Sequence, residues 1–159
     1  MKPKIGISDK NLQTVTRILN TLLSDEYVLY TKTRKFHWNV EGPLFHDLHK
    51  FFESQYEELN EVVDEVAERA RALGGISFGT LAEFSKHARL KESPGKNPVA
   101  SAMIADLLWD HEALIQTLRS DLETCANQCG DMGTGDFLTG LMEKHEKMAW
   151  MLRAMKNKN

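Results

Sequence analysis

Apolar residues recur at alternating steps of three and four along most of the 159-residue chain, which is the spacing of one face of an amphipathic α-helix. Four such sets follow one another. They are Leu12, Val15, Leu19, Leu22, Leu29 and Phe36; Phe45, Leu48, Phe52, Leu59, Val62 and Val66; Met103, Leu107, Leu114, Leu118 and Leu122; and Leu138, Leu141, Met148, Leu152 and Met155. No segment alternates with the period of two that a strand needs. The pattern predicts an all-α fold with four long helices near 8–37, 44–73, 97–127 and 134–156.

Turn-forming residues separate these four segments. The stretches "NVEGP", "GG" at 74–75, "SPGKNP" and "CGDMGTGD" interrupt the helical pattern, as glycine and proline clusters do. The connection from Gly74 to Pro98 is long, and within it Thr80 and Glu83 have the spacing of a capping box, which predicts a short extra helix. Four helices with one long crossover indicate a ferritin-like bundle. We expect one domain over 1–159, with short tails at about 1–7 and 156–159.

The overall composition is that of a water-soluble protein. The chain is 42% hydrophobic and 27% charged, with a formal net charge of −3, so no global charge attracts it to nucleic acid or to an anionic membrane. Neither a bilayer-spanning apolar run nor the apolar stretch of a signal peptide is present in the sequence. Cys125 and Cys129 do not make a disulfide framework. We therefore expect a reducing, cytoplasmic location and no membrane partner.

The second predicted helix carries a polar stripe beside its apolar one. His49, Glu53, Asp64 and Glu68 fall within roughly 100° of one another on a helical projection. Each of the two pairs has the i,i+4 spacing that presents two ligand atoms to one ion, and imidazole with carboxylate suits iron, manganese or zinc. The alternative is a solvated acidic face, which is the ordinary state of charged residues on a helix.

The two pairs are too far apart to share an ion within one chain. Their centres lie about 15 residues apart, which is roughly 22 Å along a helix. An identical helix running antiparallel, across a two-fold axis near Leu59, would place His49 and Glu53 of one subunit opposite Asp64 and Glu68 of the other. A two-fold contact repeats this arrangement twice. The spacing predicts a symmetric dimer with two intersubunit metal sites.

The stretch "FHWNVEGPLFHDLH", followed by Asp64-x-x-x-Glu68-Arg69 and "LGG", resembles the signature of the Dps family, the mini-ferritins of starved cells. The resemblance covers essentially the whole chain. It implies a hollow dodecamer built from two-fold dimers, which oxidises ferrous iron, preferably with hydrogen peroxide, and stores it as a ferric mineral. Such a protein is a ferroxidase that protects the cell against oxidative damage.

The resemblance also assigns ligands for two irons at each intersubunit site. His37 of one subunit joins Asp64 and Glu68 of its two-fold mate at the tighter site. His49 and Glu53 complete the adjacent, weaker site. Family members often carry aspartate where this chain has Glu53, so its longer side chain departs from the pattern.

Other residues are open to two interpretations each. Trp38 follows a ligand and Trp150 matches a second family tryptophan, so they either intercept stray oxidising equivalents or fill the dimer interface. Asp131 and Asp136 resemble acids that line the family's three-fold pores, and capping of a helix start is the equal alternative. The histidines outside the ligand set show no spacing that predicts a partner. They are His46, His87, His111 and His145.

DNA binding is the family's other activity and commonly depends on a lysine-rich tail. Here the terminal "MKPK" and "KNKN" are basic but short, and phosphate neutralisation needs several basic contacts. Twelve copies would add avidity, although a net charge of −3 per chain opposes it. The alternative function is that of a DNA-coating nucleoid protein with secondary metal sites, which we disfavour.

Overall fold

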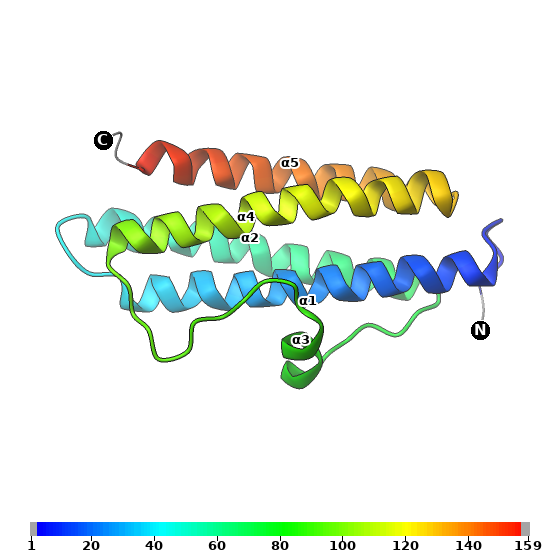
Figure 1. Cartoon of the computed structure of the whole chain (residues 1–159), viewed down its shortest axis with the longest axis horizontal. Coiled ribbons are helices and arrows are strands. Elements are labelled where there is room, and N and C mark those ends of the chain that lie inside the picture. Colours follow the sequence, from blue (N-terminus) through cyan, green and yellow to red (C-terminus); the bar gives the residue numbers. More distant parts are fainter. Residues whose placement is uncertain (1–2, 157–159) are drawn as a thin grey trace.

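The computed structural model describes residues 3–156 and, within them, contains helices and no strands (Figure 1). The helices are α1 (Asp9–Asn39), α2 (Phe45–Ala72), α3 (Leu81–His87), α4 (Ala100–Glu123), a π-helical turn η1 (Thr124–Gln128) and α5 (Met132–Met155). The predicted all-α fold, with four long helices and a short one in the crossover, is confirmed. The third long helix begins later than predicted, after Val99 rather than at 97.

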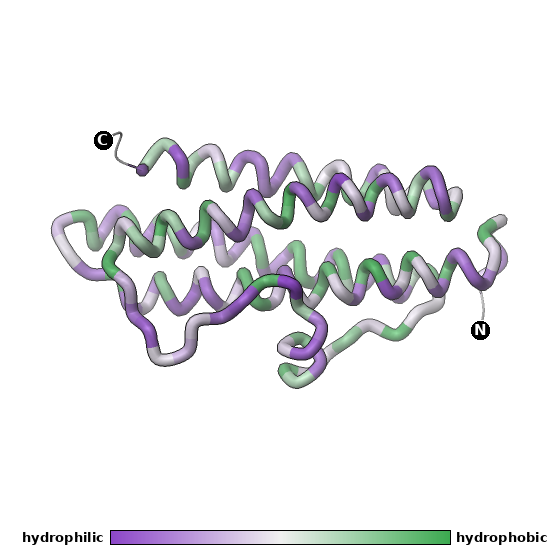
Figure 2. The backbone as a smooth tube through the Cα atoms, viewed as in Figure 1, coloured by the Kyte–Doolittle hydropathy of each residue, from purple (hydrophilic) through white to green (hydrophobic). Residues whose placement is uncertain are grey.

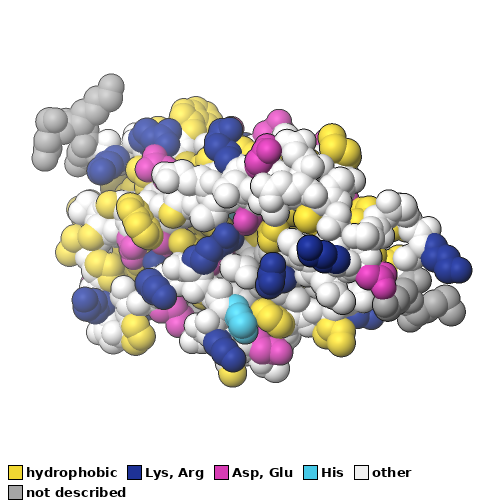
Figure 3. Space-filling model, turned by 45° about the vertical axis from the view of Figure 1, so that its right-hand side comes forward, with side chains coloured by type: hydrophobic (Ala, Val, Ile, Leu, Met, Phe, Trp, Pro, Cys, Tyr) yellow, Lys and Arg dark blue, Asp and Glu magenta, His cyan; other side chains and the backbone are white. Residues whose placement is uncertain are grey.

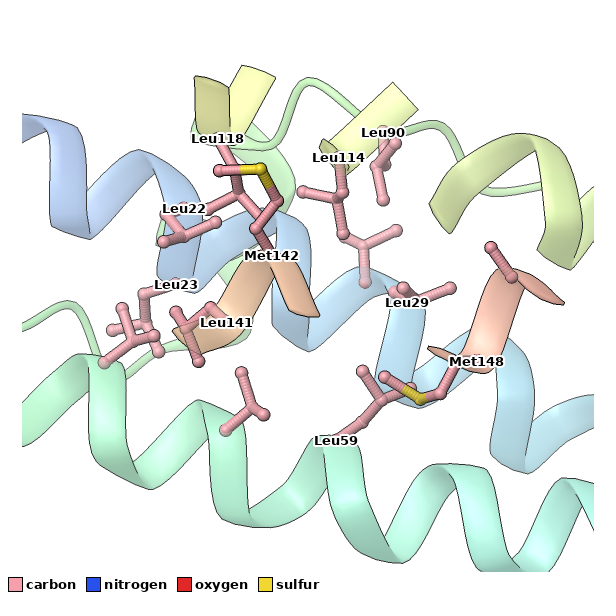
Figure 4. Packing of buried hydrophobic residues seen from close by; sticks show 14 of the residues in the cluster. Leu22, Leu23, Leu29, Leu59, Leu90, Leu114, Leu118, Leu141, Met142 and Met148 are labelled. Atoms are coloured by element: carbon pink, nitrogen blue, oxygen red, sulfur yellow. The ribbon is translucent and has the colours of Figure 1, made fainter. Parts of the chain in front are cut away.

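Two helical hairpins stack to form the bundle. Helix α1 packs along α2, α4 packs along α5, and α3 lies outside the bundle against α1 (Figure 1). Hydrophobic and hydrophilic residues are interspersed along each long helix (Figure 2). At helical spacing this places the apolar side chains on one face, which each helix turns to the interior. Leu22, Leu59, Leu114 and Leu141 come from the four long helices and are fully or almost fully buried together (Figure 4).

Two residues assigned to the core by their spacing are exposed, and a third, Leu122, is only partly buried. Phe45 is 46% exposed and Met155 is 39% exposed. Phe45 is the first residue of α2 and Met155 the last of α5, so each lies where its helix has few neighbours to cover it. Periodicity identifies the face of a helix but does not show how far the bundle extends along it.

The long crossover is held locally at the start of α3 and tied to the bundle after its end. At its start, Thr80 Oγ1 accepts a hydrogen bond from the Glu83 amide at 3.3 Å, and Glu83 accepts one from the Thr80 amide at 3.0 Å, which is the predicted capping box. After α3, Arg89 Nε donates to the buried carboxylate of Asp25 on α1 at 2.7 Å and also reaches Asp121 on α4. This arginine therefore links the crossover to two helices.

A π-helical turn ends the fourth helix. Cys125 lies in this turn with no exposed surface, and burial raises the pKa of its thiol to about 12, so it stays protonated and unreactive near neutral pH. Ala126 of the same turn approaches α5 closely. A Cβ atom at Gly135 would lie 2.8 Å from the Cβ of Ala126, so only glycine fits at that position.

A hydrogen-bonded relay of polar side chains crosses the apolar core. His145 Nε2 on α5 lies 2.9 Å from Glu26 Oε1 on α1, and His145 Nδ1 lies 2.9 Å from His111 Nδ1 on α4. All three residues are fully buried. Two of their atoms, Glu26 Oε2 and His111 Nε2, have no hydrogen-bond partner among the described residues. Residue spacing did not predict these contacts, which we call the Glu26–His145–His111 relay.

Burial of His111 makes stability depend on pH. Desolvation and the neighbouring His145 hold the pKa of His111 well below its usual 6.5, so below pH 6.5 the unfolded chain binds a proton that the folded chain does not. We expect stability to be full above pH 6.5 and to fall by up to about 1.4 kcal/mol per pH unit below it. The check is urea unfolding between about pH 8 and pH 5.5 at fixed protein concentration.

The variant His111→Gln provides the control, because it removes the titrating group and with it this part of the slope. Burial raises the pKa values of Asp25, Asp110 and Asp121 above the usual 3.8. Between 3.8 and the raised values these carboxyl groups make the protein more stable as the pH falls, which is opposite to the effect of His111. An unchanged slope in the variant would contradict the role given to His111.

Candidate metal centre

The connection between α1 and α2 brings two histidines from these helices together. His37 lies in the last turns of α1 and His49 near the start of α2. The connection reverses direction at Gly42, whose φ of +111° is a conformation that favours glycine. The two imidazole rings stack with their centroids 3.7 Å apart. The sequence assigned these residues to adjacent sites, and the structure places them side by side in one chain.

Reciprocal hydrogen bonds fix the orientation of both rings. His37 Nδ1 lies 2.8 Å from the backbone oxygen of His49, and His49 Nδ1 lies 2.8 Å from the backbone oxygen of His37. A carbonyl oxygen only accepts, so each Nδ1 carries a proton, and in the neutral ring the lone pair lies on Nε2. Histidines that bind metals commonly donate their other ring N–H to a carbonyl in this way. Both neutral rings therefore have Nε2 free of these bonds and able to bind a metal.

Glu53 follows His49 by one helical turn and is already engaged by a cation. Its carboxylate accepts a hydrogen bond of 2.6 Å from Lys50 Nζ. This hydrogen bond and the charge of Lys50 outweigh desolvation and lower the pKa of Glu53, and the same bond raises the pKa of Lys50. Sequence reasoning missed Lys50, although an i,i+3 pair of opposite charges on a helix was a visible signal.

Asp64 and Glu68 lie farther along the same helix and are exposed. Eleven residues separate Glu53 from Asp64, a rise of about 16 Å. Within residues 3–156 of a single chain, no three histidine, cysteine or acidic side chains form a group that could hold a metal ion. The predicted ligands are thus divided into a cluster of His37, His49 and Glu53 and a separate pair of carboxylates.

The surface between these two groups is hollowed. One hollow of about 440 Å³ is lined by Tyr30, Arg34, Tyr56, Glu57, Asn60 and Glu61. A second, of about 470 Å³, continues past Asp64 to Phe84 and shares Asn60 and Glu61 with the first. The face of α2 that carries the predicted ligands is therefore concave along its middle, a shape that another helix can fill.

An arginine surrounded by aromatic rings borders the histidines. The guanidinium of Arg34 lies 5.2 to 5.7 Å from the ring centroids of Tyr30, Trp38 and Tyr56, which is the range of a cation–π contact. Tyr56 also packs edge-on against His37 at 5.2 Å. Trp38 belongs to the predicted site residues. The spacing of residues 30, 34 and 38 on one face of α1 was the signal for the other contacts.

The remaining predicted residues belong to α5, with Asp131 at its N-cap. Asp131 caps α5, accepting hydrogen bonds from the Thr134 amide at 2.9 Å and from Arg69 at 3.1 Å, and is 3% exposed. This is the capping alternative that the sequence left open. Asp136 is exposed in the first turns of α5. Trp150 is 62% exposed on the same helix.

The described surface is mixed in charge, and none of its helices is long and apolar enough to cross a bilayer. The face in Figure 3 carries basic and acidic side chains interspersed with hydrophobic ones. The terminal residues 1–2 and 157–159, which hold part of the two basic tails, lie outside the described residues.

The chain matches the family model of the ferritin-like domain over residues 16–158. It is 48% identical to an uncharacterized low temperature-induced protein of Nostoc sp., over 94% of this chain and 84% of that protein. It is also 37% identical to the DNA protection during starvation protein 2 of Bacillus anthracis, over 90% of this chain and 97% of the relative.

Solved structures agree in fold. Dps from Thermosynechococcus elongatus superposes with a TM-score of 0.89 at 33% identity, covering 94% of both chains. Dps from Vibrio cholerae, described as a member of a broad superfamily of ferritin-like diiron-carboxylate proteins, gives a TM-score of 0.90 at 31% identity, covering 96% of this chain and 95% of that one. On this match of sequence and fold, the chain belongs to the Dps family of the ferritin-like superfamily.

Proposed function

We propose that this protein oxidises ferrous iron with hydrogen peroxide at sites shared by two-fold-related subunits, and stores the ferric product inside a hollow dodecamer. The observation that carries the proposal is the stacked pair of His37 and His49, whose Nε2 atoms are both available to a metal. The carboxylates that would complete the site are Asp64 and Glu68. They lie on α2 with His49, but too far along the helix to bind the same ion within one chain. A second subunit running antiparallel supplies them.

The residues divide the work between two irons, which are substrates. His37 binds one with Asp64 and Glu68 of the partner subunit, and His49 with Glu53 holds the other. Few protein ligands per ion leave positions open to water and peroxide, as a reactive site requires. Carboxylate ligands favour the harder ferric ion. Two ferrous ions supply the two electrons that reduce one peroxide to water, so no one-electron product of peroxide is released.

Exposed apolar side chains support assembly. Trp38, Leu44, Trp109 and Trp150 are each 60 to 64% exposed in the single chain, and large exposed apolar groups mark surfaces that other subunits cover. The hollowed face of α2 beside Tyr56 and Asp64 adds a concave surface for a partner helix. These features support a two-fold dimer as the unit of the dodecamer.

The test is anaerobic addition of ferrous iron to the assembled protein, followed by hydrogen peroxide. We expect ferric absorbance to grow much faster than in buffer, with two ferrous ions consumed for each peroxide. Growth of the signal at the rate seen in buffer would contradict the ferroxidase activity. A ratio of one ferrous ion per peroxide would contradict paired electron transfer.

A DNA-coating role has weaker support. It rests on relatives named for DNA protection during starvation. The net charge of −3 opposes it, because association with a duplex depends on neutralising phosphates with several basic side chains.

A further inference from the structure

The carboxylate of Glu53, a ligand of the weaker predicted site, is paired with a lysine of the same chain. Lys50 Nζ lies 2.6 Å from Glu53 Oε2, the distance of a charge-assisted hydrogen bond. Lys50 is the residue after His49 and precedes Glu53 by three, so it projects from the same turns of α2 as both ligands. The ammonium group therefore lies where a bound cation would contact the carboxylate.

We propose that Lys50 acts as an internal counter-ion at the weaker metal position, and that a divalent ion binds there only by displacing the ammonium from Glu53. The inference rests on the proposed ferroxidase function and deepens it, because it names a residue that sets the order in which two ions bind. The tighter position differs: among residues 3–156, the ion pairs found leave Asp64 and Glu68 uncommitted.

Displacement follows from charge. An ammonium group and a divalent cation repel each other strongly when both lie within a few ångströms of one carboxylate. The lysine must therefore leave Glu53 as the ion arrives. It is able to do so without disturbing the helix, because its side chain is 61% exposed. Glu57, the next acid along this part of α2, also attracts Lys50 and provides an alternative partner.

The second ion matters for the chemistry because it supplies the second electron that peroxide requires. A site whose tighter position alone is filled holds one reducing equivalent. By weakening the second position, Lys50 raises the iron concentration at which both positions are occupied. The residue thus determines when the two-electron reaction becomes available, without contacting peroxide itself.

The test is isothermal titration of the assembled protein with Zn²⁺, which binds without oxidation. In Lys50→Gln we expect the second Zn²⁺ of each site to bind about threefold to tenfold more tightly than in wild type, with the first unchanged. Lys50→Arg keeps the charge and should behave as wild type. The matched control is Lys144→Gln, which removes a comparable ion pair of 2.9 Å with Glu65 of α2, outside the ligand set.

The outcomes separate the two proposals. If assembled wild-type protein binds no Zn²⁺, the proposed metal sites are wrong and the role of Lys50 falls with them. If wild type binds two ions per site and Lys50→Gln binds the second with unchanged affinity, only the role of Lys50 is overturned. Equal tightening in Lys50→Gln and Lys144→Gln would also overturn it, since that result reflects net charge alone. If wild type binds one ion per site, the proposal requires Lys50→Gln to bind two, and a variant that still binds one would overturn it.

Discussion

Replacing Asp64 by asparagine and Glu68 by glutamine together is expected to slow peroxide-driven iron oxidation by about 100-fold or more, since even outer-shell changes cost 10- to 100-fold at metal sites. The double variant keeps side-chain size but removes both anionic ligands of the tighter position. Both residues are exposed, so the bundle does not depend on them for packing. Initial rates of ferric absorbance measure the effect, and light scattering confirms assembly.

A matched control comes from the same helix. Glu57 and Glu61 are also exposed acids on α2, and Glu57→Gln with Glu61→Gln removes the same charge without touching the predicted ligands. This control should oxidise iron at close to the wild-type rate. If both double variants lost activity equally, the loss would reflect the overall negative field rather than ligation, and the assignment of Asp64 and Glu68 would be wrong.

Mixed assemblies test whether the site is shared between subunits. A chain with Asp64→Asn and Glu68→Gln still provides His37, and a chain with His37→Ala still provides both carboxylates. Random co-assembly makes half of the dimers mixed, and each mixed dimer restores one of its two sites, so about a quarter of all sites should regain activity. Two inactive variants that remain inactive after co-assembly would contradict an intersubunit site.

Replacing His145 by leucine is expected to destabilise the protein by about 3–5 kcal/mol, the cost of removing one partner from a buried hydrogen-bonded pair that includes an acid. The loss leaves the Glu26 carboxyl group fully buried with nothing to bond and removes the partner of His111 as well. Urea unfolding at a fixed protein concentration measures the change.

The double variant Glu26→Leu with His145→Leu distinguishes this cause from loss of packing. It removes the carboxyl group together with its partner, so it should be far more stable than His145→Leu alone. If the double variant were as unstable as the single one, the buried carboxyl group would not explain the loss. The cost would then lie in the shape of the core around His145.

The sequence predicted local features well and long-range pairs poorly. Apolar spacing is a property of consecutive residues, so it identified the four long helices, and the capping box at Thr80 was visible within four residues. Exposure was harder to predict: Phe45 has the correct spacing for the core but lies at the beginning of α2, beside His49. Neighbours in space decided its burial.

For the candidate site too, spacing predicted local features and missed contacts between distant residues. The i,i+4 pairs on α2 depend on helix geometry alone, and their separation indicated a second subunit. The stacking of His37 on His49 depends on the exact reversal of the chain at Gly42, which spacing does not determine. The Glu26–His145–His111 relay joins residues 34 and 119 positions apart, and no local pattern predicts such a pairing.

The π-helical turn at Thr124–Gln128 has a consequence for how α4 is joined to α5. Its i→i+5 bonding continues to the end of the turn, where the Cys129 amide donates to the Thr124 carbonyl at 3.0 Å. The next bond comes from α5's side of the reversal, since the Asp131 amide donates to the Cys125 carbonyl at 2.9 Å. The tip of the hairpin is therefore held by backbone bonds on one side and by the close approach of Ala126 to Gly135 on the other, which makes it a rigid corner rather than a loop.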